Sequence, residues 1–198
     1  MLFVAIKGPN FDGHKFVEAA YPNGAVAALV EQRQSSQVAQ IEVANSKLAM
    51  AQLASYWRRH CDPCVLALTG SNGKTTVKEM LHQILARQAL THATRGNFNN
   101  DIGVPLTLFE LDPRHQFAII EMGANHPGEI ADLAAIARPS VGLITLCAPA
   151  HIEGFGSIEG VAHAKGEIVE TLPENGTAIL NRDDNFFDLW RTKAGSRD

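Results

Sequence analysis

The chain contains 198 residues, 45% of them hydrophobic and 19% charged, so it can bury a sizeable core as one large domain or two small ones. Its net charge of -4 and the lack of any run of lysine or arginine exclude the electrostatic footprint of a nucleic-acid binder. No apolar stretch reaches the roughly 18 residues of a membrane span, and the first residues lack the basic start of a signal peptide. We therefore expect a cytoplasmic protein without a membrane span.

The segment before residue 60 predicts part of a small α/β unit. Short apolar runs bounded by turn residues indicate strands at 2–6, 25–30 and 39–43. A helix is expected at 14–21, and a second helix begins at Ser46, whose hydroxyl can cap it. Because the segment opens directly on a strand that has no preceding element to pair with, we interpret it as an incomplete domain.

Strands and helices alternate from residue 65 onward. Buried strands that alternate with helices are typical of a parallel sheet covered on both faces, so we expect an α/β fold. The strands are predicted at 65–69, 117–122, 141–145 and 177–181, and the helices at 75–87, 128–137 and 157–172. Cys61-Asp62-Pro63 breaks the preceding helix, which divides the chain into domains 1–62 and 63–198. The second domain is also expected to be incomplete, because TKAGSRD ends the chain without an obvious closing element.

Three cysteines are too few for a disulfide framework and suit a reducing compartment. Cys61 and Cys64 form a CxxC motif, which can be a redox pair or half of a zinc site. No second CxxC motif or closely spaced histidine pair completes a metal set. We therefore expect no functional role for the pair.

The stretch TGSNGKTT at residues 69–76 lies between an apolar strand and an apolar helical pattern. Where a strand turns sharply into a helix, the first amide N–H groups of the helix are unpaired and can bind an anion. Lys74 can reach the β and γ phosphates of a nucleotide, and the Thr75 hydroxyl can bind Mg²⁺. The common form of this motif has a glycine where the chain has Leu68, and a tight turn with an exposed lysine is the alternative. The expected nucleotide-binding residues are Gly70, Ser71, Asn72, Gly73, Lys74, Thr75 and Thr76.

The phosphate-binding stretch resembles that of the Mur ligases, which typically reads TGTNGKT. Four further stretches carry the same resemblance: GNFNNDIGVPLT at 96–107, IIEMGANHPGEI at 119–130, AHIEGFGSIEGVAHAKGEI at 150–168 and LPENGTAILNRDD at 172–184. The first segment is similar to the later part of the family's N-terminal domain, which binds the UDP-linked substrate. Such ligases have three domains, so the resemblance implies a partial N-terminal domain, an incomplete central ATP-binding domain and no C-terminal domain.

The resemblance implies an ATP-dependent ligase of peptidoglycan precursor synthesis that works through an acyl phosphate. Within the family, the resemblance is greatest to the member that adds D-alanyl-D-alanine to UDP-N-acetylmuramoyl-tripeptide. The stretches that favour this member are GNFNNDIGVP followed by EMGANHPGEI. We expect a monomer. We expect the chain alone to have very weak activity or none. Three alternatives stay open: another Mur-type ligase, a folylpolyglutamate-type amide ligase, and a nucleotide-binding fragment without turnover.

The resemblance also implies a Mg²⁺ site. Glu121 follows an apolar strand, at the end where parallel sheets bind ligands, and matches the family's metal glutamate. His151 matches a histidine that helps to bind a second Mg²⁺, and Lys165 matches a lysine that reacts with CO₂ to form a carbamate. Each has an ordinary alternative, namely a solvated carboxylate, a surface histidine and a surface lysine. The catalytic set is Lys74, Glu121, His151 and Lys165, and the metal set is Thr75, Glu121, His151 and Lys165.

Asparagines mark two further expected contacts. Asn97, Asn99 and Asn100 form a polar loop whose amides suit hydrogen bonds to substrate oxygens, although clustered asparagines are also common in turns. Asn181 matches the family residue that reads adenine, with Asp184 nearby, and an Asx turn is the alternative there.

Overall fold

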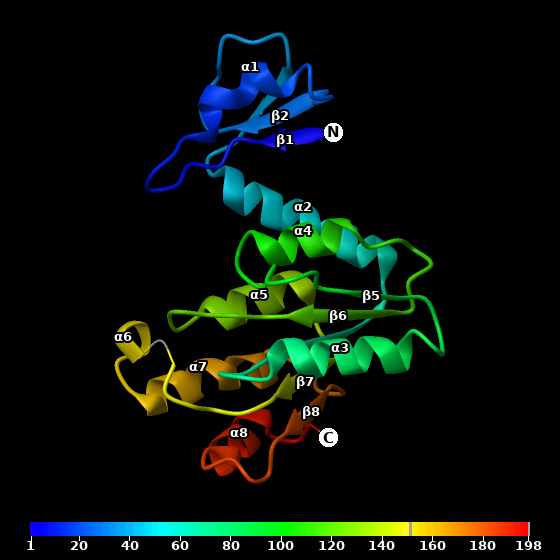
Figure 1. Cartoon of the computed structure of the whole chain (residues 1–198), viewed down its shortest axis with the longest axis vertical. Coiled ribbons are helices and arrows are strands. Elements are labelled where there is room, and N and C mark those ends of the chain that lie inside the picture. The colour runs from blue at the N-terminus through cyan, green and yellow to red at the C-terminus, as the bar shows by residue number, and fades with distance from the viewer. Residues whose placement is uncertain (151, 198) are drawn as a thin grey trace. The chain divides into compact units, whose positions relative to one another are not determined.

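The computed structural model describes residues 1–150 and 152–197. The chain separates into two compact units, Met1–Leu53 and Ala54–Asp198, whose elements are traced in Figure 1. The division falls inside α2 (Ser46–Cys61), not after this helix as the sequence predicted. The reason is that the second half of α2 packs on the second unit, where Trp57 Nε1 donates a 2.9 Å hydrogen bond to the carbonyl of Leu111.

The first unit has a three-stranded parallel sheet in the order β1-β2-β3. Its small core is apolar and includes Val17, Ala28 and Val30. Because the predicted helix begins with a 3-10 turn, its α-helical part is only one turn long. The elements are β1 (Leu2–Val4), η1 (Gly13–Phe16), α1 (Val17–Ala20), β2 (Ala27–Val30) and β3 (Ala39–Glu42).

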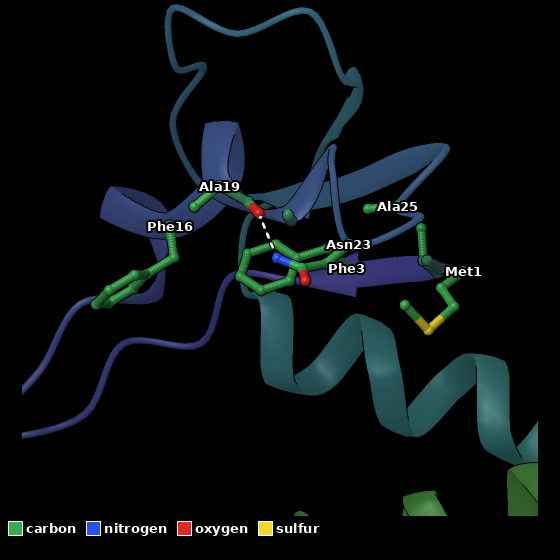
Figure 2. Close-up of a pocket in the computed structure, with 8 residues that line it drawn as sticks. Met1, Phe3, Phe16, Ala19, Asn23 and Ala25 are labelled. Carbon is green, nitrogen blue, oxygen red and sulfur yellow. Dashed lines mark hydrogen bonds between the residues drawn. The ribbon is translucent and has the colours of Figure 1, made fainter.

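A hollow of about 370 Å³ lies in the first unit beside β1 and α1. Figure 2 shows Phe3, Phe16 and Met1 around it, and Asn23 Nδ2 donates a 2.8 Å hydrogen bond to the carbonyl of Ala19. The lining side chains carry no charge and are mostly apolar. This hollow therefore lacks the groups that a phosphate site needs.

The second unit has five parallel strands in the order β5-β6-β4-β7-β8, which confirms the predicted parallel α/β fold. The central strand β4 pairs with β6 on one side and with β7 on the other. Since the strand order reverses at β4, the carboxyl ends of these three strands form a switch point of the kind where α/β proteins bind ligands. The strands are β4 (Cys64–Thr69), β5 (Thr91–Ala93), β6 (Phe117–Glu121), β7 (Val141–Ile144) and β8 (Thr177–Leu180).

Helices cover both faces of this sheet (Figure 1). Successive side chains of a strand point to opposite faces, so Ala118 and Ile120 enter the core that β6 shares with α4, α5 and α7. Ile119 and Glu121 point to the other face, where α3 packs against β4, β5 and β6. The helices are α3 (Lys74–Leu85), α4 (Gly103–Phe109), α5 (Glu129–Ala137), α6 (Ile152–Phe155), α7 (Ile158–Glu170) and α8 (Phe187–Ala194).

The last helix, α8, packs on α7 and β8 and was not predicted from the sequence. Its Trp190 is fully buried, and Trp190 Nε1 donates a 2.9 Å hydrogen bond to the carbonyl of Ala162 in α7. The helix therefore closes the core over this end of the sheet. Over residues 1–150 and 152–197, no helix is both long and apolar enough to cross a membrane.

Candidate functional site

The phosphate loop, residues 70–73, joins the end of β4 to the start of α3. Gly73 precedes the helix with a left-handed φ of 80°, and no side-chain hydrogen bond is made at this N-cap. The first amides of α3 are thus available to an anion at the positive end of the helix dipole. Asn72, Gly73 and Thr75 are exposed, so the mouth of the loop is open to a ligand.

The loop that follows β7 braces the phosphate loop. A Cβ atom at Gly70 would collide with Thr145 Oγ1, so only glycine allows this close approach. Thr145 Oγ1 donates a 2.7 Å hydrogen bond to the carbonyl of Asn72. Ser71 Oγ donates to the carbonyl of Ala148 and accepts from its amide, both at 2.9 Å. The backbone of the phosphate loop is therefore held in shape from one side.

Lys74 begins α3, and its Nζ donates a 2.7 Å hydrogen bond to the carbonyl of Gly70. This bond folds the side chain back over the phosphate loop. Partial burial lowers the pKa of Lys74, and the carboxylate of Glu121 opposes that shift. A cation thus lies beside unpaired amides, an arrangement that suits a polyphosphate group.

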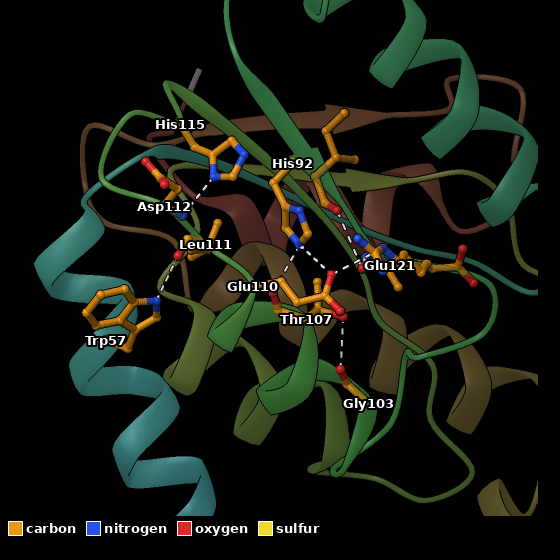
Figure 3. Close-up of polar contacts among 12 residues, drawn as sticks. Trp57, His92, Gly103, Thr107, Glu110, Leu111, Asp112, His115 and Glu121 are labelled. Carbon is orange, nitrogen blue, oxygen red and sulfur yellow. Dashed lines mark hydrogen bonds and ion pairs between the residues drawn. The ribbon is translucent and has the colours of Figure 1, made fainter. Parts of the chain in front are cut away.

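Glu121, at the end of β6, is 1% exposed and has both carboxylate oxygens engaged. Its Oε2 accepts a 3.1 Å hydrogen bond from Thr75 Oγ1, and its Oε1 accepts a 2.9 Å bond from Asn99 Nδ2. The amide of Glu121 donates to Thr94 Oγ1 at 3.0 Å, and Figure 3 shows Glu121 at this strand end. The structure therefore brings Thr75 and Glu121 together, and a hydroxyl with a carboxylate is an oxygen donor set that fits Mg²⁺.

Lys165 lies within α7 and is 7% exposed. Burial, helped by the positive charge of Lys74 and opposed by Cys147, lowers the pKa of Lys165 to about 8. A substantial fraction of its amine is therefore uncharged slightly above neutral pH. The positive charge of Lys74 acts on Lys165 and lowers its pKa, so this part of α7 lies near the phosphate loop.

His151, the remaining predicted metal residue, lies outside the described residues. In the part of the chain that the structure describes, no three His, Cys, Asp or Glu side chains gather to hold a metal ion by themselves. A metal at Thr75 and Glu121 would thus need phosphate or water oxygens to complete its ligands. Cys61 and Cys64 are free thiols.

The three predicted substrate asparagines share one loop but differ in their contacts. Asn99 donates to Glu121, as described above, and Asn100 Oδ1 accepts from the amides of Ile102 and Gly103 at the start of α4, at 3.2 and 2.8 Å. Asn97 is exposed. The turn chemistry that the sequence left open is thus present at Asn100, while Asn97 is accessible to a ligand.

Asn181 and Asp184 follow β8 and form the turn that was the alternative to an adenine contact. Asn181 Oδ1 accepts a 3.1 Å hydrogen bond from the amide of Asp183. The carboxylate of Asp184 accepts from the amide of Cys147 at 2.7 Å and from the amide of Phe186 at 2.9 Å. Asp184 therefore ties this turn to the loop after β7 that braces the phosphate loop.

Sequence reasoning missed three side chains that shape the site: Thr145, Thr94 and Lys78. Thr145 ends a predicted strand, so its place beside the phosphate loop follows once β7 is paired with β4. Thr94 follows a three-residue strand that the sequence did not predict. Lys78 occupies a position within the apolar pattern of α3. A lysine there ordinarily extends its ammonium group to solvent, and nothing in the neighbouring sequence indicates that this one is buried.

Residues 68–198 match the family model described as the Mur ligase middle domain. The UDP-N-acetylmuramoyl-tripeptide--D-alanyl-D-alanine ligase of Escherichia coli (strain K12) is 50% identical over 196 residues, which cover 99% of this chain and 43% of the relative. The ligase of the same name from Haemophilus influenzae is 48% identical over 195 residues. These cover 96% of this chain and 43% of the relative. The chain thus spans less than half the length of these curated relatives.

Two solved structures are similar over the whole chain. A crystal structure of MurF from Acinetobacter baumannii has a TM-score of 0.96 and 44% identity, and the chain covers 44% of it. The crystal structure of MurF ligase from Thermotoga maritima in complex with ADP has a TM-score of 0.91 and 35% identity, and the chain covers 46% of it.

Proposed function

The chain belongs to the Mur ligase family through its middle domain, and from this premise we propose that it carries the nucleotide site of an ATP-dependent amide-forming ligase. The observation that carries the proposal is the hydrogen bond between Thr75 and the buried Glu121. This bond lies at the N-terminus of α3, where no side chain caps the first amides. A relative that was solved with ADP supports a nucleotide as the ligand.

The ligase would add D-alanyl-D-alanine to UDP-N-acetylmuramoyl-tripeptide, the reaction for which the two curated relatives are named. Because the chain spans 43% of their length, we expect the 198 residues alone to turn over substrate very weakly or not at all. We place the reaction in the cytoplasm and expect a monomer. The free thiols Cys61, Cys64 and Cys147 fit such a reducing compartment.

Amide formation of this kind needs a substrate carboxylate and several phosphate groups to be held together. A carboxylate oxygen forms a bond to the γ-phosphorus of ATP as ADP leaves, and the amine nitrogen then forms the amide bond as phosphate and a proton leave. The amides of α3 and Lys74 would bind the β and γ phosphates and stabilise the charge on departing ADP. Thr75 and Glu121 would hold Mg²⁺, which neutralises phosphate charge when bound.

Lys165 would act as the carbamate that the family resemblance implies. Its amine nitrogen would form a bond to the carbon of CO₂ with loss of a proton, and the product would be an anion in place of a cation. The lowered pKa of about 8 supports this reaction, because only the uncharged amine is nucleophilic. With His151, this group would add metal ligands to those from Thr75 and Glu121.

Adenine and substrate contacts complete the proposal. Asn181 would read adenine through its Nδ2 group, since its Oδ1 already accepts a hydrogen bond from the amide of Asp183. Asp184 would support that turn, since its carboxylate already accepts two backbone amides. Asn97 would contact the UDP-linked substrate directly, whereas Asn99 and Asn100 would act by orienting Glu121 and starting α4.

The test of the ligase reaction is phosphate release from ATP with UDP-N-acetylmuramoyl-tripeptide and D-alanyl-D-alanine. The same sequence, extended at both ends to the length of its relatives, should release phosphate only when both substrates are present. Its Glu121→Gln variant should be strongly impaired, because a neutral amide is a poor Mg²⁺ ligand. Absence of substrate-dependent release from the extended wild type would overturn the proposed reaction, and nucleotide binding alone would then favour a binding module.

A further inference from the structure

Lys78 is the only fully buried side chain of α3, a helix of 12 residues that the structure describes completely. A buried ammonium is costly unless it is paired and hydrogen-bonded. Its Nζ donates to the carbonyl of Thr94 at 2.7 Å and approaches the carbonyl of Gly96 at 3.5 Å and Glu79 Oε1 at 3.1 Å. These three acceptors match the three N–H groups of a lysine.

The segment that Lys78 holds connects β5 to the asparagine loop and touches Glu121 in two places. Thr94 Oγ1 accepts a 3.0 Å hydrogen bond from the amide of Glu121. Further along, Asn99 Nδ2 donates a 2.9 Å bond to Glu121 Oε1, and the carbonyl of Asn99 accepts from the amide of Gly123 at 2.7 Å. Both the backbone and the carboxylate of Glu121 are thus positioned by a segment that Lys78 anchors.

We propose that Lys78 is a positioning residue: it fixes the segment 94–99 on α3 and thereby orients the Glu121 carboxylate toward Thr75. This inference rests on the proposed function, in which Thr75 and Glu121 hold the Mg²⁺ of a nucleotide. Lys78 itself touches neither nucleotide nor metal. Partners outside the ligand shell set the orientation of metal ligands, and their loss weakens metal binding even though the ligands remain.

The alternative is that Lys78 merely satisfies two backbone carbonyls and contributes to stability. The two roles differ in what they change. A stability role lowers the melting temperature without altering how much Mg²⁺ strengthens ATP binding. A positioning role lowers the Mg²⁺-dependent gain and leaves the metal-free affinity for ATP, which depends on the phosphate loop and Lys74, in place.

The experiment is calorimetric titration of ATP into the chain, in excess Mg²⁺ and in EDTA, with the ratio of the two affinities as the readout. Lys78→Met keeps most of the length of the lysine side chain but removes its ammonium group. Thr94→Val keeps the shape of the threonine side chain but removes Oγ1, which accepts a hydrogen bond from the amide of Glu121. Both should reduce the ratio about 10-fold and leave the affinity in EDTA within about twofold of wild type. Lys15→Met, at an exposed lysine of the first unit, is the matched control and should keep the wild-type ratio.

A folded Lys78→Met chain with the wild-type ratio would overturn the inference, and so would an equal loss of affinity in Mg²⁺ and in EDTA. Should Lys78→Met fail to unfold cooperatively by circular dichroism, Thr94→Val decides, because it leaves the buried ammonium paired with its carbonyls. In a Glu121→Gln background, Lys78→Met should reduce the ratio no further, since both changes act on one carboxylate. A wild-type chain with no gain from Mg²⁺ would instead overturn the metal site itself, and this inference with it.

Discussion

Thr75 Oγ1 donates a 3.1 Å hydrogen bond to Glu121 Oε2, and this contact joins the first turn of α3 to the carboxyl end of β6. The two residues are 46 positions apart in the sequence, and the parallel pairing of β4 with β6 brings them together. A hydroxyl and a carboxylate thereby converge beside the phosphate loop.

Replacing Thr75 should weaken the dependence of ATP binding on Mg²⁺. In Thr75→Val the hydroxyl that contacts Glu121 is lost, and we expect the gain in ATP affinity from Mg²⁺ to fall about 10-fold. Thr75→Ser keeps the hydroxyl and should restore most of the gain. Calorimetric titrations with and without Mg²⁺ measure the effect, and a Thr75→Val chain that responds to Mg²⁺ like wild type would contradict the assignment.

Gly70 should tolerate no side chain. In Gly70→Ala the new Cβ collides with Thr145 Oγ1, whereas a Cβ at Gly73 meets no atom within 4 Å. We expect Gly70→Ala to destabilise the chain by about 1–3 kcal/mol and to lower ATP affinity, because the phosphate loop must shift. Gly73→Ala is the matched control, with only the strain of its left-handed φ, about 1 kcal/mol. Urea unfolding compares the two, and equal losses of stability would contradict the steric account.

Lys165 should make stability depend on pH in a defined window. Its pKa is lowered to about 8 from 10.5, so between these values the unfolded chain binds more protons and the unfolding free energy rises with pH. The full penalty, on the order of 3 kcal/mol, is present below pH 8. In CO₂-free buffer, Lys165→Met should therefore be more stable than wild type at pH 7, and this advantage should shrink toward pH 10. A constant difference across that range would contradict the burial of a charged amine.

His92 should weaken the fold in acid. Its Nε2 lies 3.0 Å from the carbonyl of Thr107 and 4.0 Å from Glu110 Oε2. Figure 3 shows how His92, Thr107 and Glu110 face one another. Burial is the main cause that lowers the pKa of His92, followed by His115. As the pH falls through 6.5, the imidazole of His92 is therefore protonated in the unfolded chain before it is protonated in the folded chain. The unfolding free energy consequently decreases below about pH 6.5. His92→Gln removes the titrating group, so its unfolding free energy should fall less between pH 7 and 5 than that of wild type.

The main strands and helices of the second unit were predictable because their signals are local. The predicted strand 65–69 became β4 (Cys64–Thr69), and the predicted helix 157–172 became α7 with Ser157 as its cap. Elements with weak local signals were missed. β5 has three residues, and α4 contains Gly103 and Pro105, which are poor helix formers.

The candidate site was predictable in part for the same reason. The phosphate loop is contiguous in the sequence, and Glu121 was found because it ends an apolar strand. The bonds that orient Glu121 were not predictable, since Asn99 and Thr94 reach it only through the pairing of β5 with β6. The sequence gives no signal for a division inside α2, because the helical pattern of Ser46–Cys61 runs on without a break.

The most direct test of the account is the affinity of the chain for Mg²⁺-ATP, measured by calorimetry for wild type and for Lys74→Ala. Loss of a hydrogen-bonded cation beside the phosphates should cost about 1.5–3 kcal/mol of binding free energy. The dissociation constant of Lys74→Ala should therefore be roughly 10- to 100-fold larger than that of wild type. Lys15→Ala, at an exposed site in the first unit, should bind like wild type. Equal affinity of wild type and Lys74→Ala would contradict the claim that residues 70–76 bind the phosphates of a nucleotide.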